Sequence, residues 1–244
     1  MRIVSCVPSV SELIFWLNPD CLAGRTRFCV FPGADLSVPR VGGTRNLDAA
    51  RIRRLKPDLL VAVKEENDRG QIEALAREFP VRLFDVRNMA DCIRMVRELG
   101  YIIGQAQKVK EWETVFNENW AGFGRVSRGT CLYLIWQKPW MAAGGDTFIH
   151  EMLTRAGFTN LFGHRRRYPE TDLEEIARLE PGWILLSDEP YPFGEVHREQ
   201  IQKLFPRSRV VCVDGAWFSW YSQRVAGMPG WLSSFFSGLS RQPD

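Results

Sequence analysis

The hydrophobic positions of the chain form two similar series, one in each half. The segment DAARIRRLKPDLLVA begins at Asp48, and DLEEIARLEPGWILLS begins at Asp172, an offset of 124 residues. Both open with a short stretch that is apolar at i, i+3 and i+4, which is typical of an amphipathic helix. A proline ends each stretch and an apolar run follows it, so each segment predicts a helix and then a strand.

The flanking segments repeat as well. The strand-like run RIVSCV precedes the helical pattern SVSELIFWL, and TCLYLIW precedes DTFIHEMLTRAG after a glycine-rich turn. Ser9 and Glu12 have the spacing of a capping box, in which a hydroxyl and a carboxylate bind the free amides at a helix start. The alternation of strands and helices predicts an α/β fold with two Rossmann-like lobes, each built on a parallel sheet.

A long amphipathic stretch separates the two halves. From the expected N-cap Asn88 onward, apolar residues recur at steps of three and four as far as Phe123, and no proline interrupts them. This pattern predicts one long backbone helix of about 34 residues, roughly 50 Å in length, that joins the lobes. A break near Gly104 into two helices is the alternative.

The predicted division of the chain follows from this stretch. Residues 1–87 form the N-terminal lobe, 88–125 the linking helix and 126–244 the C-terminal lobe. Two lobes on a rigid helix would leave a cleft between them. Because ligands of open parallel sheets collect outside the carboxyl ends of the strands, we expect the loops after the strands to carry the function.

The charge of the chain argues against a nucleic-acid partner. The 244 residues include 32 Lys and Arg and 29 Asp and Glu, a formal net charge of +3, whereas nucleic-acid surfaces concentrate basic residues. The one basic cluster, HRRRYP from His164 to Pro169, fits either a solvated loop or a wall that attracts an anionic group.

The N-terminal residues and the cysteines bear on the compartment. MRIVSCVPSVSELIFWL reads as folded protein from the start, without the long apolar region of a secretory signal. We therefore expect a cytoplasmic protein as the sequence stands, or a periplasmic one if an export signal was removed. No run approaches the ~20 apolar residues of a membrane span. The 6 cysteines lack C-x-x-C spacing, which argues against a zinc site. Cys6, Cys131 and Cys212 lie in apolar, strand-like runs, and we expect reduced thiols.

The sequence contains no motif typical of catalysis or nucleotide binding. Neither G-x-x-x-x-G-K-[ST] nor G-x-G-x-x-G nor G-x-S-x-G occurs. The histidines His150, His164 and His197 are far apart and lack the spacing of a metal site. We expect no enzyme, no metal ligands and no catalytic cofactor. The turn AAGGDT could present amides to an anion, although a tight turn is the favoured interpretation.

Taken together, these segments resemble the helical-backbone, or class III, solute-binding proteins of ABC importers, and their cobalamin-binding branch most closely. The resemblance covers nearly the whole chain in order, through VPSVSELIFWL, VPRVGGTRNLDAARIRRLKPDLLVA with KEEN, KPWMAAGGDTFIHEML, YPETDLEEIARLEPGWILLS, DEPYPFGE and VDGAWFSWYSQR. It implies a non-catalytic receptor of the periplasmic binding protein type that holds cobalamin or another corrinoid in an aromatic cleft. Gly42 and Gly43 then match the turn before the second helix, not a nucleotide loop.

The resemblance also implies which residues contact the ligand. Stacking side chains suit the wide apolar faces of a corrin ring, although these rings could instead pack the lobes. The aromatic candidates are Phe31, Trp140, Tyr168 and Trp217. Charged residues after the strands could hold polar ligand groups or lie in solvent, and these are Lys64, Glu65 and Glu189.

One position departs from the family pattern. Exported members dock on their permease through a surface carboxylate on each lobe, and in the first lobe that position holds Arg69 here; a shift of one residue would bring in Asp68. The basic residues of a transporter would repel a cation, so Arg69 argues against the ABC permease that the resemblance otherwise implies.

Two other functions stay open at this point. A ferric siderophore or haem binding protein would use the same cleft. For siderophores the cationic candidates are Arg165, Arg166 and Arg167, and His164 is the best placed histidine for an axial ligand. A cytoplasmic corrinoid-handling enzyme is the second alternative, and it would need a titratable pair deep in the cleft.

Overall fold

The structure is a computed structural model that describes residues 1–29, 37–123 and 126–239. The chain divides into two compact units. Unit 1 comprises Met1–Glu118 and Tyr221–Ala226, and unit 2 comprises Asn119–Trp220 and Gly227–Asp244. Each unit is an open parallel sheet with helices on both faces, which confirms the predicted fold class.

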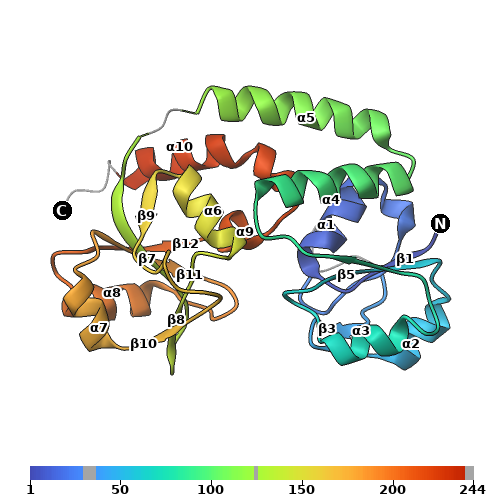
Figure 1. Cartoon of the computed structure of the whole chain (residues 1–244), viewed down its shortest axis with the longest axis horizontal. Coiled ribbons are helices and arrows are strands. Elements are labelled where there is room, and N and C mark those ends of the chain that lie inside the picture. Colours follow the sequence, from blue (N-terminus) through green and yellow to red (C-terminus); the bar gives the residue numbers. More distant parts are fainter. Residues whose placement is uncertain (30–36, 124–125, 240–244) are drawn as a thin grey trace. The chain divides into compact units, whose positions relative to one another are not determined.

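Unit 1 is built on a four-stranded parallel sheet in the order β2-β1-β5-β6. The strands are β1 (Ile3–Ser5), β2 (Leu22–Gly24), β5 (Leu59–Val63) and β6 (Val81–Phe84). Helices α2 (Ala49–Leu55) and α3 (Arg69–Leu75) cover one face, and α1 (Pro8–Leu17) and α4 (Met89–Ile102) cover the other (Figure 1). Alternate strand residues such as Leu60 and Ala62 are buried against Ile52 of α2 and Ile72 of α3.

Unit 2 repeats this plan and adds an edge. Parallel strands β9 (Phe158–Asn160), β7 (Gly129–Trp136), β11 (Trp183–Ser187) and β12 (Arg209–Val213) lie in that order, and β8 (Trp140–Ala142) and β10 (Glu170–Thr171) extend the β7 edge in antiparallel pairing. Helices α7 (Leu173–Leu179) and α8 (Glu195–Leu204) cover one face, and α6 (Phe148–Arg155) and α10 (Met228–Leu239) cover the other (Figure 1).

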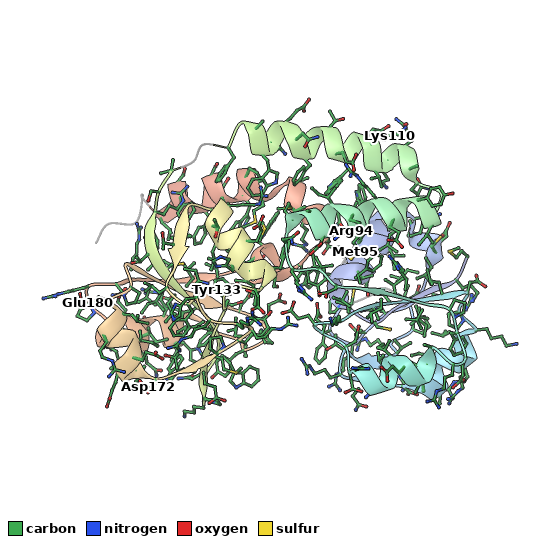
Figure 2. The ribbon with its side chains drawn as sticks, in the orientation of Figure 1. Arg94, Met95, Lys110, Tyr133, Asp172 and Glu180 are labelled. Carbon is green, nitrogen blue, oxygen red and sulfur yellow. The ribbon has the colours of Figure 1, made fainter. Side chains whose placement is uncertain are left out.

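The duplicated segments adopt the same local structure. Asp48 caps α2 and Asp172 caps α7, each accepting from the amide three residues on. Each helix then ends on a left-handed residue at φ 45°, Lys56 in one and Glu180 in the other. Figure 2 shows Asp172 and Glu180 at the two ends of α7. The offset of 124 residues therefore holds for both caps, which confirms the internal repeat.

The prediction of one uninterrupted linking helix is wrong. The chain forms α4, which ends at Ile102, and then α5 (Ala106–Ala121). Gly104 adopts φ +75°, a left-handed geometry that ends helices. The chain reverses there and brings Val109 so close to Gly100 that a β-carbon on Gly100 would lie 2.3 Å from the Val109 side chain. The hydrophobic pattern hid this break, since each helix buries its own apolar stripe.

The capping box predicted for Ser9 and Glu12 is also wrong. Helix α1 begins at Pro8 after the N-cap Val7, with no side-chain hydrogen bond at the cap, and the Ser9 hydroxyl has no hydrogen-bond partner among the described residues. Glu12 is instead an almost fully buried member of an ion pair described below. The predicted cap Asn88 is confirmed, since its side chain accepts from the Asp91 amide at 2.9 Å.

Candidate functional site

Both sheets place a topological switch point between their two central strands. In unit 1 the order reverses between β1 and β5, and in unit 2 it reverses between β7 and β11. Loops that leave neighbouring parallel strands in opposite directions open a crevice at their carboxyl ends, where ligands of such sheets bind. The candidate site is therefore sought at these ends, within each unit separately.

A buried asparagine fixes the switch point of unit 1. The Asn67 amide nitrogen donates to the carbonyls of Cys6 and Thr44 at 2.9 and 2.8 Å, and its oxygen accepts from the Val63 amide at 2.9 Å. These bonds join the ends of β1 and β5 to the hairpin of β3 (Gly42–Gly43) and β4 (Asn46–Leu47). The loop 64–68 is thereby held rigidly at the carboxyl edge.

The charged candidates of unit 1 lie on this loop. The Lys64 ammonium lies 3.3 Å from Asp85, and the Glu65 carbonyl accepts from Arg45 at 3.3 Å. The pKa of Asp85 is lowered, first by its bonds to the Arg87 guanidinium and then by Lys64. Lys64 therefore shares a carboxylate with Arg87, and its role in binding ligand stays a prediction, as does that of Glu65.

A segment from the C-terminal part of the chain completes unit 1. Arg224 donates to both carboxylate oxygens of Glu12 at 2.7 and 2.8 Å, and the Gln223 side chain donates to the same carboxylate at 2.6 Å. The Tyr221 hydroxyl donates to Glu66 at the carboxyl edge. Residues 221–226 are therefore built into the core and edge of unit 1.

In unit 2 the corresponding edge carries a cluster of rings. Trp140 lies parallel to Phe193 with centroids 6.2 Å apart, Tyr191 packs on Phe193 at 4.7 Å, and Trp136 meets Tyr191 edge-on at 5.5 Å. Trp136 ends β7 and is 37% exposed, whereas Phe193 is buried. The cluster thus has a packed base and open rings, an arrangement suited to stacking on a flat apolar ligand.

Hydrogen bonds orient the middle of this aromatic cluster. The Tyr191 hydroxyl donates to the Gln137 amide oxygen at 3.0 Å and lies 3.3 Å from His197 Nε2. The Gly194 amide donates to His197 Nδ1 at 3.2 Å, so the neutral ring carries its proton on Nε2 and donates it to Tyr191. His197 is therefore a positioning residue for a tyrosine at the carboxyl edge.

Tyr168 precedes the edge strand that pairs with the strand of Trp140. Thr171 of β10 lies opposite Trp140 of β8, and Tyr168 comes three residues earlier. Tyr168 is half-buried and follows Arg167, which adopts φ 59°. The structure thus places Tyr168 just before the strand that pairs with the strand of Trp140. Contact of either residue with ligand stays a prediction.

The two glycine amides of the turn AAGGDT form hydrogen bonds within the protein itself. The Gly144 and Gly145 amides donate to the carbonyls of Arg167 and Arg165 at 2.8 and 2.7 Å. A β-carbon on Gly145 would lie 2.0 Å from the Gly163 oxygen. This geometry agrees with the tight turn that we favoured and leaves these amides occupied.

Two arginines of the basic cluster are paired inside unit 2. Arg165 bonds to Glu175 and lies 4.2 Å from the ring of Phe162, and Arg167 lies 3.9 Å from Asp146. The cluster at 164–167 is thus largely structural, since its charges meet carboxylates of the same unit.

Glu189 lies among polar groups after β11. Its carboxylate accepts from the Ser219 hydroxyl at 2.6 Å. Burial is the main cause that raises the pKa of Glu189, and the nearby Asp188 and Asp214 raise it further. Tyr133, labelled in Figure 2, is fully buried, and its hydroxyl donates to the Ser187 hydroxyl at 3.1 Å.

The last two aromatic candidates fare differently. Trp217 is stacked on Trp231 of α10 with centroids 5.4 Å apart, which shows a packing role and leaves ligand contact a prediction. Phe31 lies outside the described residues. Sequence reasoning missed Trp136, Tyr191 and Phe193, although DEPYPFGE was noted, because a strand end and a loop over 50 residues away supply the cluster.

All 6 cysteines are free, as predicted, and burial raises the pKa of Cys6 to about 12. Within the described residues, no group of three or more His, Cys, Asp or Glu side chains could hold a metal ion. Nor does that part of the chain contain a helix with the length and apolar character of a membrane span.

Comparison with known proteins shows the family of this chain. Residues 3–207 match the family described as periplasmic binding protein. The chain belongs to the periplasmic binding protein family. Membership makes it a binding protein of the kind that serves ABC transporters, and not an enzyme.

Relatives of this periplasmic binding protein extend over nearly its whole length. The Vitamin B12-binding protein of Pectobacterium carotovorum is 22% identical over 98% of this chain and 89% of its own. That of Salmonella typhimurium is 24% identical over 92% and 85%. The matches therefore cover both units and most of each relative.

Solved structures share the fold. The periplasmic Vitamin B12 binding protein of Vibrio cholerae has a TM-score of 0.77 at 18% identity, over 99% of this chain and 98% of its own. A periplasmic heme binding protein of Pseudomonas aeruginosa has a TM-score of 0.82 at 22% identity, over 96% and 92%. At these identities the likeness shows the fold alone.

Proposed function

We propose that this periplasmic binding protein binds cobalamin or a related corrinoid, unchanged, for delivery to an ABC importer. The observation that carries the proposal is the open aromatic cluster at the carboxyl ends of β7 and β11, where Trp136 and Trp140 stand on a packed base. Such a cluster suits the flat apolar face of a macrocycle. The many curated relatives named for vitamin B12 make a corrinoid the first candidate.

We propose the following contacts from the residues that lie at the carboxyl edge of each unit. Trp136, Trp140 and Tyr191 stack on the ring, and Tyr168 contacts it from the segment before β10. Polar substituents of the ring bind to the charged loops at the carboxyl ends of the strands. Lys64 and Glu65 supply these contacts in unit 1, and Glu189 does so in unit 2.

Haem is the second candidate, because solved structures of heme-binding proteins share the fold over 96–97% of this chain. Ferric siderophores fit less well. Two of the three arginines considered for them, Arg165 and Arg167, already face Glu175 and Asp146. A guanidinium committed to a carboxylate offers less to an anionic ligand.

The start of helix α3 in unit 1 carries a cation where exported family members carry a docking carboxylate. Arg69 begins α3, its side chain is 90% exposed, and it pairs with Glu73 at 2.6 Å. Asp68 is occupied as the cap of α3, accepting from Gln71. At the start of α8 the corresponding first residue is Glu195, which is exposed. We propose that a permease docks with a surface adapted to this mixed charge.

The test is calorimetric titration of the purified protein with cyanocobalamin, cobinamide, haemin and a ferric siderophore. The corrinoids should bind with saturation and displace one another. Trp136→Ala should weaken binding by roughly tenfold or more, the effect of losing a stacked ring and its buried area. Trp183→Phe is the control, because Trp183 lies at the amino end of β11 on the same sheet.

The outcomes separate the candidates. Saturable binding of haemin without binding of either corrinoid would identify haem, and not a corrinoid, as the ligand. Equal affinity of the wild type and Trp136→Ala for a corrinoid would remove the aromatic cluster from the site. Binding of none of the four ligands would refute the proposal.

A further inference from the structure

A recess of about 440 Å³ lies within unit 1, beside the β3–β4 hairpin. This volume falls in the range of small-molecule sites, roughly 300–1,000 Å³. Three arginines line it, together with a single carboxylate, and these residues are Arg27, Arg40, Arg51 and Asp48. The lining is therefore strongly cationic, unlike the aromatic edge of unit 2.

The backbone holds these arginines together. The segments around Arg25 and Arg40 run in parallel, with the Arg25 amide donating to Pro39 at 3.0 Å and the Val41 amide to Arg25 at 2.8 Å. The Arg27 amide donates to Gly42 at 2.8 Å. Gly42 adopts φ +101°, and a β-carbon there would lie 2.4 Å from the Asn46 oxygen, so the floor of the recess requires glycine.

The single carboxylate is already committed to one arginine. Asp48 accepts from the Arg51 amide at 2.9 Å and pairs with the Arg51 guanidinium at 3.0 Å. Arg51 also donates to the Arg40 carbonyl at 3.2 Å. Arg27 lies 4.8 Å from the ring of Phe28. In residues 1–29, 37–123 and 126–239, no carboxylate pairs with the guanidinium of Arg27 or of Arg40.

We propose that this recess binds a small polyanion with adjacent oxyanion groups, a phosphate ester or a di- or tricarboxylate. The charges of Arg27 and Arg40 repel each other in one hollow, and an anion between them would relieve that repulsion. A guanidinium presents a planar fork of donors that matches carboxylate and phosphate oxygens. Asn46, in the same lining, offers a side-chain amide as a further donor.

The recess borders the carboxyl edge of the unit 1 sheet. The hairpin that lines it also supplies the Thr44 carbonyl that accepts from Asn67 at the switch point. A bound anion would therefore stiffen the hairpin next to the loop 64–68. The proposal is independent of corrinoid binding, because it concerns other residues and a small anionic ligand instead of a large apolar ring.

The experiment is calorimetric titration of the metal-free, corrinoid-free protein with sodium pyrophosphate and, separately, with citrate. We expect saturable binding that weakens as salt rises, since exposed charges are screened. Arg27→Gln and Arg40→Gln should each weaken binding by about tenfold, the effect of losing hydrogen bonds to a charged group. Arg77→Gln, which removes an exposed charge of unit 1 outside the recess, should leave binding unchanged.

The outcomes are distinct. Binding of pyrophosphate alone identifies a phosphate site, and binding of citrate alone identifies a carboxylate site. Saturation with neither anion overturns the proposal, and so does an equal loss in Arg77→Gln, which would show only a general charge effect. If a variant fails to fold, side-chain ¹⁵N NMR of the wild type decides. The signals of Arg27 and Arg40 must shift with anion while that of Arg77 does not, and the opposite pattern overturns the site.

Discussion

Removing Arg224 should destabilise unit 1 strongly, because it leaves a buried negative charge without its cation. The Glu12 side chain is 2% exposed and that of Arg224 is 24% exposed, and two hydrogen bonds of 2.7 and 2.8 Å join them. Breaking a buried ion pair by deleting one partner costs roughly 3–5 kcal/mol. The lower end applies to Arg224→Met, since Gln223 still donates to the carboxylate and Arg224 is partly solvated.

The measurement is urea and thermal unfolding of wild type and variants by circular dichroism. A loss of about 3 kcal/mol in the transition of unit 1 corresponds to a fall in Tm on the order of 10 °C for a unit of this size. Because the chain has two units, two transitions are expected to separate, and the one assigned to unit 2 should not move.

A second variant isolates the cause. Glu12→Gln in the Arg224→Met background removes the stranded charge, so the double variant should be more stable than Arg224→Met alone. Arg69→Met is the control, since Arg69 pairs with Glu73 on an exposed helix face and its loss should not shift the transition measurably. The reasoning is refuted if Arg224→Met unfolds like the wild type, or if the double variant is the less stable of the two.

Three further changes test other parts of the structure by the same unfolding assay. Asn67→Leu removes the side-chain hydrogen bonds of two buried backbone groups and one part-buried group and should cost about 3 kcal/mol, whereas a neutral result would contradict its bridging role. Gly145→Ala should cost about 3 kcal/mol, because the new β-carbon would lie 2.0 Å from the Gly163 oxygen. Gly230→Ala should stabilise by about 0.5–1 kcal/mol, because Gly230 lies in a helix and a β-carbon there would meet nothing within 4 Å. The pKa of Glu189 in the folded protein is raised, mainly by burial, so the stability of unit 2 falls as pH rises through that pKa. Glu189→Gln should therefore stabilise unit 2 at pH 7 and reduce the dependence of its stability on pH. An unchanged pH profile would argue against a buried carboxylate at Glu189.

The duplicated helices were predictable because all their signals are local. A capping aspartate, an amphipathic turn, and a proline after the helix lie within ten residues at both Asp48 and Asp172. The apolar runs after these two helices predicted the strands of the parallel sheets. Sequence reasoning therefore recovered both the fold class and the repeat.

The break at Gly104 was harder to predict. The stripe of apolar residues continues in phase from α4 into α5, and one glycine lowers helix propensity by only about 1 kcal/mol. The reversal is accompanied by a close approach of Val109 to Gly100, where a β-carbon would lie 2.3 Å from the Val109 side chain. That contact exists only after folding, so periodicity alone favoured a single helix.

The same limit applies to Glu12 and to the aromatic cluster. Local spacing assigned Glu12 to a capping box with Ser9, but its partner Arg224 lies 212 residues away. Trp140 was found from a family resemblance, whereas Trp136 and Tyr191 join its cluster, through Phe193, only when the ends of β7 and β11 come together. Long-range pairing leaves no periodic trace in one sequence.

The most direct test of corrinoid binding at the aromatic cluster is ¹⁹F NMR of the protein labelled with 5-fluorotryptophan. The chain has 9 tryptophans, and their resonances can be assigned by single substitutions. On addition of cyanocobalamin, the resonances of Trp136 and Trp140 should shift with saturation while that of Trp183, at the amino end of β11, stays in place. Unmoved signals from Trp136 and Trp140 at a cyanocobalamin concentration that saturates binding, or shifts confined to Trp183 and other distant rings, would contradict the account.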